Sequence, residues 1–449
     1  MSLGKSIAYA APAFALAVVG IPIYVYVPKF YTDVIGVNIA ILGYILLSVR
    51  IFDAVTDPLI GVLSDKTRSR FGRRRPYIGG GALILAVSIW LLFTPPEASP
   101  RFETCWFGIC IFSLFLFWTL VTVPYESLGP EITFNYDERT VLFGIRDGAL
   151  IAGTLVAASS PAAVVWIFDL PSDAGGERAK FFWISAIYAP LVVALCWVCV
   201  LSIRERPESL SDQRVELRRG FQSLVRNRPF GILLVAYTIS AFGNNLPASL
   251  ILYYVQYVLQ SKNADFFLFL YFATGVLFLP AWILVARWIG KKWTWLAAMA
   301  VNTGAFSGVF FLGPGDEKVY GMLVFISGIG FGATVALPSA IQADVIDYDE
   351  LLSGQRREGH YIGLWSITRK LAAAMGVGLA LSLLGLVGYK PNVEQSAGVL
   401  LTLRILYSLV PCVCNVAAFI VLLAYPISRP LHEQIRRAIA ERKAGQSIY

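Results

Sequence analysis

The sequence predicts an all-α integral membrane protein with twelve transmembrane helices in two six-helix halves. Of its 449 residues, 57% are hydrophobic and only 15% are charged, whereas soluble proteins carry about 25% charged residues. The apolar stretches run for roughly twenty residues without strict alternation, which is the length of a spanning helix and not the pattern of a barrel strand. Lipid satisfies no backbone polar group, so the spanning segments must be helices.

Hydropathy places six spans on each side of one long polar connection. The predicted spans cover residues 7–32, 39–64, 77–94, 105–128, 141–168 and 180–203, followed by 229–258, 264–289, 293–313, 319–344, 358–388 and 399–425. The predicted organisation is therefore a first half (1–203), a linker (204–228), a second half (229–425) and a tail (426–449).

Lysine and arginine residues sort by loop, and this sorting predicts the orientation because basic loops stay in the cytoplasm. One side would hold most of them, including the clusters around residues 66–75, 204–228, 287–292 and 429–443. The opposite side would hold only Lys29, Arg101, Arg178, Lys180, Lys262, Lys318 and Lys390. An odd number of spans would break this pattern, so we expect both termini in the cytoplasm. The net charge of +8 then reflects topology, and no nucleic-acid partner is expected.

The second predicted span carries two carboxylates, Asp53 and Asp57. Their spacing of four residues puts them on one helix face, about one turn apart. Burying a lone anion in hydrocarbon costs several kcal/mol, so a cation must lie between them or one must hold a proton. We predict a site for sodium or a proton, formed by both aspartates and the Thr56 hydroxyl.

An alternative is that Asp53 and Asp57 pair with fixed protein cations such as Arg50 and Lys370. Lys370 lies well inside the eleventh predicted span, where an ionisable residue indicates function. The two interpretations overlap, because a lysine that approaches the aspartates when the cation leaves would itself be a coupling device.

Other charged residues stand near the ends of predicted spans. Arg146 can clamp a carboxylate, a phosphate or a sugar hydroxyl, and Glu126 is its alternative partner. Opposite charges at connections can form breakable gates, although retention of basic loops or a solvated loop would explain the same residues. The predicted gating residues are Asp65, Arg73, Arg74, Arg139, Asp344, Asp347, Arg357 and Glu358.

Several motifs in order resemble the glycoside-pentoside-hexuronide:cation symporters, a group of the major facilitator superfamily that contains melibiose permease. The motifs are YTDVIG (31–36), DAVTDPLIG (53–61), TRSRFGRRRPYI (67–78), VPYESLGPEIT (123–133), DERTVLFGIR (137–146) and the block 344–370. The resemblance covers essentially the whole chain. It implies that Asp53 and Asp57 bind sodium, lithium or a proton, that Lys370 links the cation and solute sites, and that the solute binds between the two halves.

The sugar site of that family matches less well. Ala17 and Thr122 stand where the permease has sugar-binding aspartates, so a galactoside is not expected. Tyr24 matches a pocket tyrosine and Trp365 faces the cavity by position, and aromatic planes favour sugar rings. The predicted solute contacts are Tyr24, Thr122, Glu126, Arg146, Trp365 and Lys370.

Together these features predict a cation-coupled symporter of a glycoside, pentoside or uronate, in the inner membrane of a bacterium and acting as a monomer. The alternative solutes are an amphiphile such as a lysolipid, which the related eukaryotic symporters carry, and a sulfonated sugar. We expect no cofactor beyond the coupling cation, and no enzyme. The sequence lacks a GxxxxGK loop, and its only histidines, His360 and His432, fall in a loop and the tail.

Overall fold

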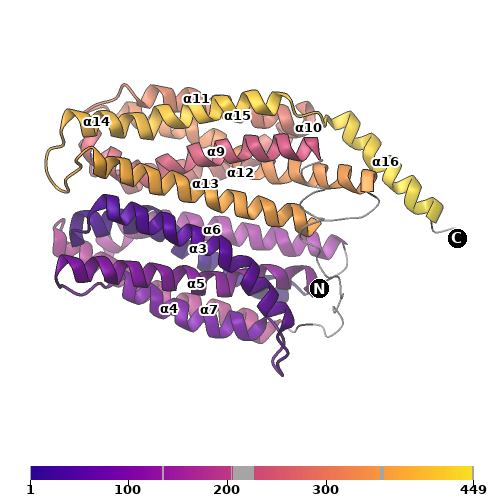
Figure 1. Cartoon of the computed structure of the whole chain (residues 1–449), viewed down its shortest axis with the longest axis horizontal. Helices are drawn as coiled ribbons and strands as arrows, with labels where there is room; N and C mark the ends of the chain where they lie inside the picture. The colour runs from indigo at the N-terminus through magenta and orange to yellow at the C-terminus, as the bar shows by residue number, and fades with distance from the viewer. Residues whose placement is uncertain (1, 134–135, 204, 206–226, 354–357, 447–449) are drawn as a thin grey trace.

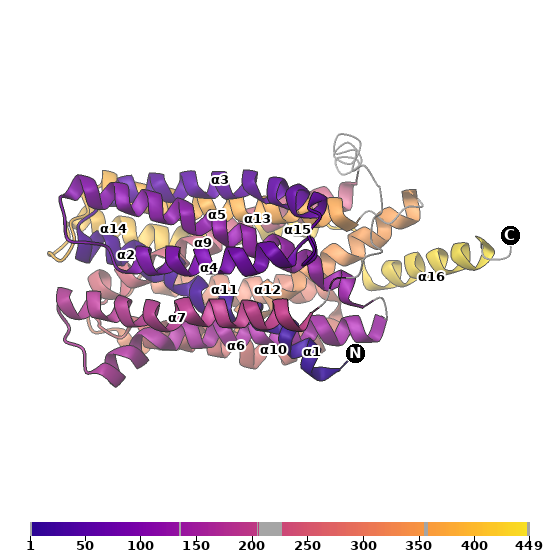
Figure 2. The ribbon, with the colours of Figure 1, turned by 90° about the horizontal axis from the view of Figure 1, so that it is seen from below.

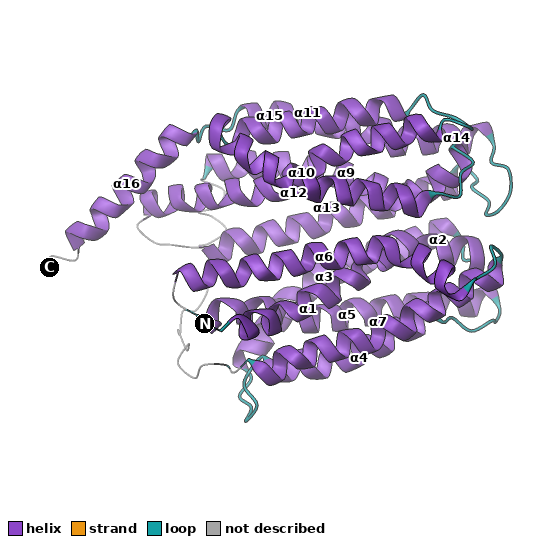
Figure 3. Cartoon of the chain, turned by 180° about the vertical axis from the view of Figure 1, so that it is seen from behind, coloured by secondary structure: helices purple, strands orange, loops and turns teal. Residues whose placement is uncertain are grey.

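The computed structural model shows two groups of long helices packed side by side (Figure 1). It describes residues 2–133, 136–203, 205, 227–353 and 358–446, and every regular element within these ranges is a helix (Figure 3). Both termini lie at one end of the bundle (Figures 1 and 2), which we call the terminal end; the opposite end is the distal end. The all-helical architecture in two halves confirms the predicted fold class.

The first half begins with a helix that contains two π-helical turns. Its elements are α1 (Leu3–Ile21), η1 (Pro22–Tyr26), α2 (Val27–Phe30), η2 (Tyr31–Ile35), α3 (Ile39–Lys66), α4 (Arg75–Phe93), α5 (Pro100–Ile132), α6 (Tyr136–Phe168) and α7 (Ala174–Ser202). Proline lacks the N–H that a regular helical ladder needs, and Pro22 is the first residue of η1. The wider turns carry Tyr24 and Asp33, which reappear below.

The second half repeats this plan and ends with a helix that extends from the terminal end (Figure 1). Its elements are α9 (Arg228–Tyr253), η3 (Tyr254–Val258), α10 (Ala264–Ile289), α11 (Lys291–Val309), α12 (Glu317–Ser353), α13 (Glu358–Leu386), α14 (Ala397–Arg404), η4 (Ile405–Leu409), α15 (Val410–Leu423) and α16 (Arg429–Gln446). Nearly all of the predicted linker lies outside the described residues.

Eleven helices in the described ranges are long and apolar enough to cross a membrane. The remaining predicted span, 293–313, corresponds to α11, which is less apolar because it carries Lys291, Lys292, Thr294 and Asn302. It packs along α12, α10 and α15. Its polar residues are sheltered: Thr294 and Asn302 are buried against these neighbours. Thus α11 belongs to the second group of six.

The seam between the halves is formed mainly by α3 and α13, and also by α6 and α10. Near the distal end, α3 and α13 approach so closely that only glycine fits. A Cβ on Gly43 would lie 2.9 Å from the backbone N of Ser382, and one on Gly378 would lie 2.8 Å from the Cβ of Leu47. Such contacts exclude any larger side chain, so the two halves touch through their backbones there.

The buried core also shows that the two halves are in contact at the distal end. One apolar cluster runs from the first half into the distal part of the second, joining residues such as Leu42 of α3 to Leu250 of α9 and Leu384 of α13. A separate cluster, which includes Trp295 and Tyr361, lies within the second half. The halves therefore share a continuous core at the distal end.

Candidate cation and solute site

Two aspartates of α3, one buried and one half-buried, share one lysine of α13 at the seam between the halves. Asp53 is 2% exposed, and its Oδ2 lies 3.0 Å from the Nζ of Lys370. The same ammonium also pairs with Oδ2 of Asp57. The structure thus brings together the aspartates and the lysine that the sequence analysis selected. We call Asp53, Asp57 and Lys370 the central cluster.

A threonine of α5 completes the central cluster on the side of the first half. The Oγ1 of Thr119 lies 2.6 Å from Oδ1 of Asp53 and 3.1 Å from Oδ1 of Asp57. Its hydroxyl has one proton, so it donates to one carboxylate at a time and keeps lone pairs for another partner. Thr56, which the sequence selected, instead donates to the backbone carbonyl of Asp53 at 3.1 Å. Carboxylate and hydroxyl oxygens are the ligands that hard cations prefer.

Arg50 stands beside the central cluster and one turn before Asp53. Its Nη1 lies 3.8 Å from Oδ2 of Asp53, and its side chain is 11% exposed. Its Cζ lies 4.2 Å from the ring centroid of Tyr24 and 4.4 Å from that of Phe115. The arrangement in the structure is therefore the alternative stated above, in which protein cations neutralise the aspartates.

Two of the predicted solute residues, Tyr24 and Trp365, are aromatic side chains packed against neighbouring side chains. Tyr24 packs against Arg50 as described, and Trp365 of α13 stacks on Tyr237 of α9 with ring centroids 4.0 Å apart. The hydroxyl of Thr122 donates to the carbonyl of Trp118 within α5.

Arg146 and Glu126, the other predicted solute residues, do not form a pair with each other. Nη2 of Arg146 lies 2.7 Å from Oδ1 of the adjacent Asp147, and the guanidinium also covers the ring of Phe143. Glu126 is exposed on α5. A neighbouring carboxylate in the same helix, Asp147, therefore pairs with Arg146 in place of the predicted Glu126.

At the terminal end of the first half, backbone N–H groups of two predicted gating arginines, Arg73 and Arg74, and of the neighbouring Arg75 meet one carboxylate. The carboxylate of Glu205 accepts hydrogen bonds from the N–H groups of Arg73, Arg74 and Arg75 at 2.7, 2.9 and 2.8 Å. An anion at a helix N-terminus is favoured by the free N–H groups and the helix dipole. The side chain of Arg74 also donates to the carbonyl of Ser127 on α5.

The second half has a charged cluster at its terminal end. Lys291 pairs with Asp344 at 2.5 Å, and Nε2 of His432 lies 3.0 Å from Asp347 and 3.4 Å from Asp344. We expected a span ending at residue 344 and charges in the connection that follows. That boundary was wrong: α12 continues to Ser353, and Lys291 and His432 lie against aspartates within this helix.

Four predicted gating residues lie wholly or in part outside the described residues. Arg357 lies outside the described residues, and so do the side chains of Asp65, Arg139 and Glu358.

A second junction between the halves lies at the distal end, and no sequence motif indicated it. Asp33 of η2 accepts hydrogen bonds from the hydroxyls of Tyr389 at 2.6 Å and Tyr257 at 3.0 Å. Lys29 supplies its counter-charge at 2.5 Å, and Nδ2 of Asn392 donates to the Asp33 carbonyl at 2.6 Å. Burial, and then the Asp33 charge, raise the pKa of Tyr389 far above its ordinary value, so this hydroxyl remains a donor. We call these five residues the distal junction.

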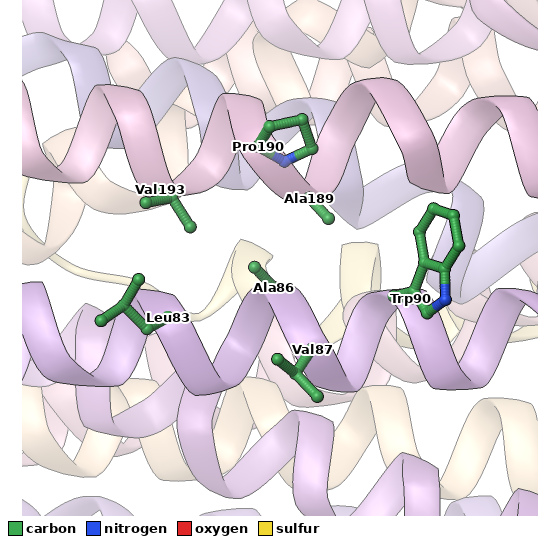
Figure 4. A pocket seen from close by; sticks show the side chains of 7 residues that line it. All are labelled: Leu83, Ala86, Val87, Trp90, Ala189, Pro190 and Val193. Carbon is green, nitrogen blue, oxygen red and sulfur yellow. The ribbon is translucent and has the colours of Figure 1, made fainter.

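A groove of about 340 Å³ lies between α4 and α7 (Figure 4). It is lined by Leu83, Ala86, Val87, Trp90, Ala189, Pro190 and Val193. Several of these side chains are exposed apolar groups, which suits a surface covered by lipid chains and not a site for a polar solute.

Comparison with known proteins agrees with the fold. The glucuronide carrier protein homolog of Escherichia coli (strain K12) is 29% identical over 99% of this chain and 96% of its own length. The isoprimeverose transporter of Lactiplantibacillus pentosus is 27% identical over 90% of this chain and 84% of its own length. The crystal structure of the nucleoside transporter NupG shares the fold, with a TM-score of 0.66 at 13% identity over 95% of this chain and 100% of that one. The model of the family described as MFS/sugar transport protein matches residues 8–429, and the chain belongs to this family.

Proposed function

We propose that this protein is a cation-coupled symporter of a small organic solute, a glycoside, pentoside or uronate, and that it works by alternating access. The observation that carries the proposal is the central cluster. Two carboxylates on α3, in the first half, share one ammonium on α13, in the second half. A cation that binds these carboxylates therefore changes a contact between the two halves.

The coupling step is a competition between Lys370 and a mobile cation for the same oxygens. Sodium or a proton that reaches Asp53 and Asp57 removes the need for the ammonium, because a buried anion requires only one compensating charge. Lys370 then becomes free to turn toward the solute. A ligand shifts a conformational equilibrium only by its differential affinity for the two states, and this exchange supplies such a difference.

Solute recognition is proposed at the same level of the bundle. Tyr24, of the first half, lies beside Arg50, and Trp365, of the second half, lies on the same helix as Lys370 and stacks on Tyr237. Sugar rings stack on aromatic planes while their hydroxyls take hydrogen bonds. The relatives named for glucuronide and isoprimeverose support a sugar-like solute.

We further propose that the terminal end faces the cytoplasm of a bacterial cell and that the protein acts as a monomer in the inner membrane. The basic residues Arg73, Arg74, Arg75, Lys291 and Lys292 all lie at the terminal end. Lys29 lies at the distal end, where Asp33 is its partner. This distribution matches the retention of basic loops on the cytoplasmic side.

Uptake into proteoliposomes tests the proposal. The probes are p-nitrophenyl glucosides, xylosides and glucuronides, with a sulfonated sugar and lysophosphatidylcholine as the alternative solutes. An inward sodium gradient or an inward proton gradient should stimulate uptake of at least one sugar, whereas a choline gradient should not. Which gradient acts identifies the coupling cation.

Variants at the central cluster show whether these carboxylates carry the coupling. Asp53→Asn and Asp57→Asn should each abolish gradient stimulation while leaving some solute binding. Asp173→Asn is the matched control: Asp173 caps α7, and asparagine caps a helix equally well. Stimulation that persists in both central variants would refute the assignment, and stimulation of lysolipid uptake alone would replace the sugar with an amphiphile.

A further inference from the structure

Arg75 lies between the terminal ends of α4 and α7, and most of its guanidinium is unused. It is the first residue of α4, and its Nε donates to the carbonyl of Val200, near the end of α7, at 2.7 Å. Its side chain is partly exposed, and neither of its Nη atoms has a hydrogen-bond or ion-pair partner among the described residues. A guanidinium fixed through one nitrogen keeps its remaining N–H groups for a second acceptor, such as a phosphate.

An exposed, apolar face of α4 leads from Arg75 into the groove between α4 and α7. Four residues at helical spacing form this face: Gly80, Leu83, Val87 and Trp90. A Cβ added to Gly80 would meet no atom within 4 Å, so the face is uncovered between Arg75 and the groove. The last three residues line the groove itself (Figure 4).

Aromatic side chains mark both ends of this apolar surface. Toward the terminal end, a Cβ on Gly79 would lie 3.8 Å from the ring of Trp197 on α7, and this ring is partly exposed. At the distal end, the rings of Trp90 and Phe182 meet edge to face with centroids 5.2 Å apart. The groove is therefore a bounded stretch of the apolar surface that starts beyond Arg75 and ends at an aromatic pair.

The length of this surface suits one lipid molecule. Leu83 and Trp90, at the two ends of the groove on α4, lie roughly 12 and 22 Å along the helix from Arg75, at a rise of about 1.5 Å per residue. An acyl chain crosses one leaflet, which is about half of the 30 Å hydrocarbon core. A chain whose phosphate lies at Arg75 therefore reaches into the groove.

The charges near Arg75 favour an anionic head group. Residues 73–75 contribute three positive charges, and the carboxylate of Glu205, which accepts hydrogen bonds from their backbone, contributes one negative charge. The apolar groove would accept a chain of any lipid, but the excess positive charge attracts a head group without an ammonium. Basic pockets between transmembrane helices bind anionic lipid head groups in this way.

We propose that Arg75 and the groove between α4 and α7 bind one anionic phospholipid. Its phosphate pairs with the Nη atoms of Arg75, and one acyl chain fills the groove. The site differs from general coverage by the bilayer, because a named side chain fixes the head group and a bounded surface fixes the chain. It is independent of the proposed transport cycle.

Lipid retention by the purified full chain tests the site. Native mass spectrometry in detergent would compare dioleoyl phosphatidylglycerol with dioleoyl phosphatidylcholine, and inorganic phosphate would probe the head-group contact alone. Wild type should retain one phosphatidylglycerol about fivefold more often than phosphatidylcholine, as expected for an arginine that meets an anionic lipid. Phosphate at the same concentration should not displace the lipid, because it makes no contact with the groove.

Variants separate the two parts of the site. Arg75→Gln should lower retention of phosphatidylglycerol to that of phosphatidylcholine. Arg75→Lys should keep an intermediate preference, because lysine offers charge without a bidentate fork. Val193→Phe fills the groove and should lower retention of phosphatidylglycerol. The matched controls are Arg287→Gln, exposed at the terminal end of α10, and Val198→Phe, exposed on α7 outside the groove. Both should behave as wild type.

Equal retention of the two lipids by wild type, displacement by phosphate, or an unchanged preference in Arg75→Gln would each overturn the proposal. So would a preference lost in Arg287→Gln, or retention in Val193→Phe no lower than in Val198→Phe. If Arg75→Gln does not fold, Arg75→Lys takes its place, and an undiminished preference in that variant would overturn the proposal.

Discussion

Aspartates join the two halves at two levels, and their charges are neutralised in different ways. At the distal junction, Asp33 has a counter-ion from its own half, Lys29, and the other half contributes only neutral donors, Tyr257 and Tyr389. At the central cluster, Asp53 and Asp57 receive Lys370 from the other half. Separating the halves therefore leaves Asp53 and Asp57 without the ammonium of Lys370 at the central cluster. At the distal junction it breaks only hydrogen bonds from neutral donors.

This difference assigns separate roles to the two levels. A contact whose charge is balanced within one half can open and close without a cation. A contact whose charge balance spans both halves opens only when another cation replaces the lysine. We infer that the distal junction sets how readily one access state closes, and that the central cluster makes this change depend on the cation.

The largest effect is expected from removing the central lysine. Lys370→Met leaves Asp53 and Asp57 without their shared cation, and breaking a buried ion pair in this way typically costs about 3–5 kcal/mol. Thermal unfolding in detergent should show a large loss of stability. The double variant Lys370→Met/Asp57→Asn should recover part of it. If the double variant is as unstable as the sum of both single changes, the two groups are not coupled.

A smaller effect is expected from Asp33→Asn at the distal junction. This change leaves Lys29 without its carboxylate but retains an acceptor for the tyrosine hydroxyls, so the loss should be about 1–3 kcal/mol. Uptake should still respond to the cation gradient, because Asp33 has no part in the exchange. Gradient stimulation lost in Asp33→Asn but kept in Asp53→Asn would reverse the roles assigned to the two levels.

Tyr389→Phe should cost about 1 kcal/mol, the worth of one neutral hydrogen bond. The pKa of Tyr389 is raised from its ordinary value of 10.0, so its stabilising contribution is complete below that pH and falls as the pH rises above it. The stability difference between wild type and Tyr389→Phe should be constant from about pH 6 to 9 and change only in stronger alkali. A difference that varies around neutral pH would show that another group titrates there.

The smallest effect is expected at the terminal end. His432→Ala removes the contact of α16 with Asp347, but Lys291 still neutralises Asp344. Partly exposed ion pairs contribute about 0–1 kcal/mol. Thermal stability and gradient stimulation should both stay close to wild type, and loss of stimulation would give α16 a part in the transport cycle.

The sequence predicted those features that follow from local pattern. Spans follow from runs of apolar residues, and Asp53, Asp57 and Lys370 stand out because charges are rare in such runs. Thr119 could not be recognised, because a hydroxyl in an apolar helix is common and only its position against α3 makes it a partner. The distal junction was missed for a related reason: Asp33, Tyr257 and Tyr389 lie far apart in the sequence, and only the packing of the two halves brings them together. Asp347 was assigned to a connection because it follows the end of an apolar run; its partner, His432, lies 85 residues further along the chain and no local pattern links the two.

The central claim is that Lys370 and a mobile cation compete for Asp53 and Asp57. Thermal stability of wild type and Lys370→Met, measured in sodium and in choline chloride and across pH, tests it directly, because a ligand that binds the folded state stabilises it. Lys370→Met should be unstable in choline and gain far more stability than wild type from sodium, or from acid if the cation is a proton. If the variant gains no more than wild type from either cation, the lysine and the cation do not share a site.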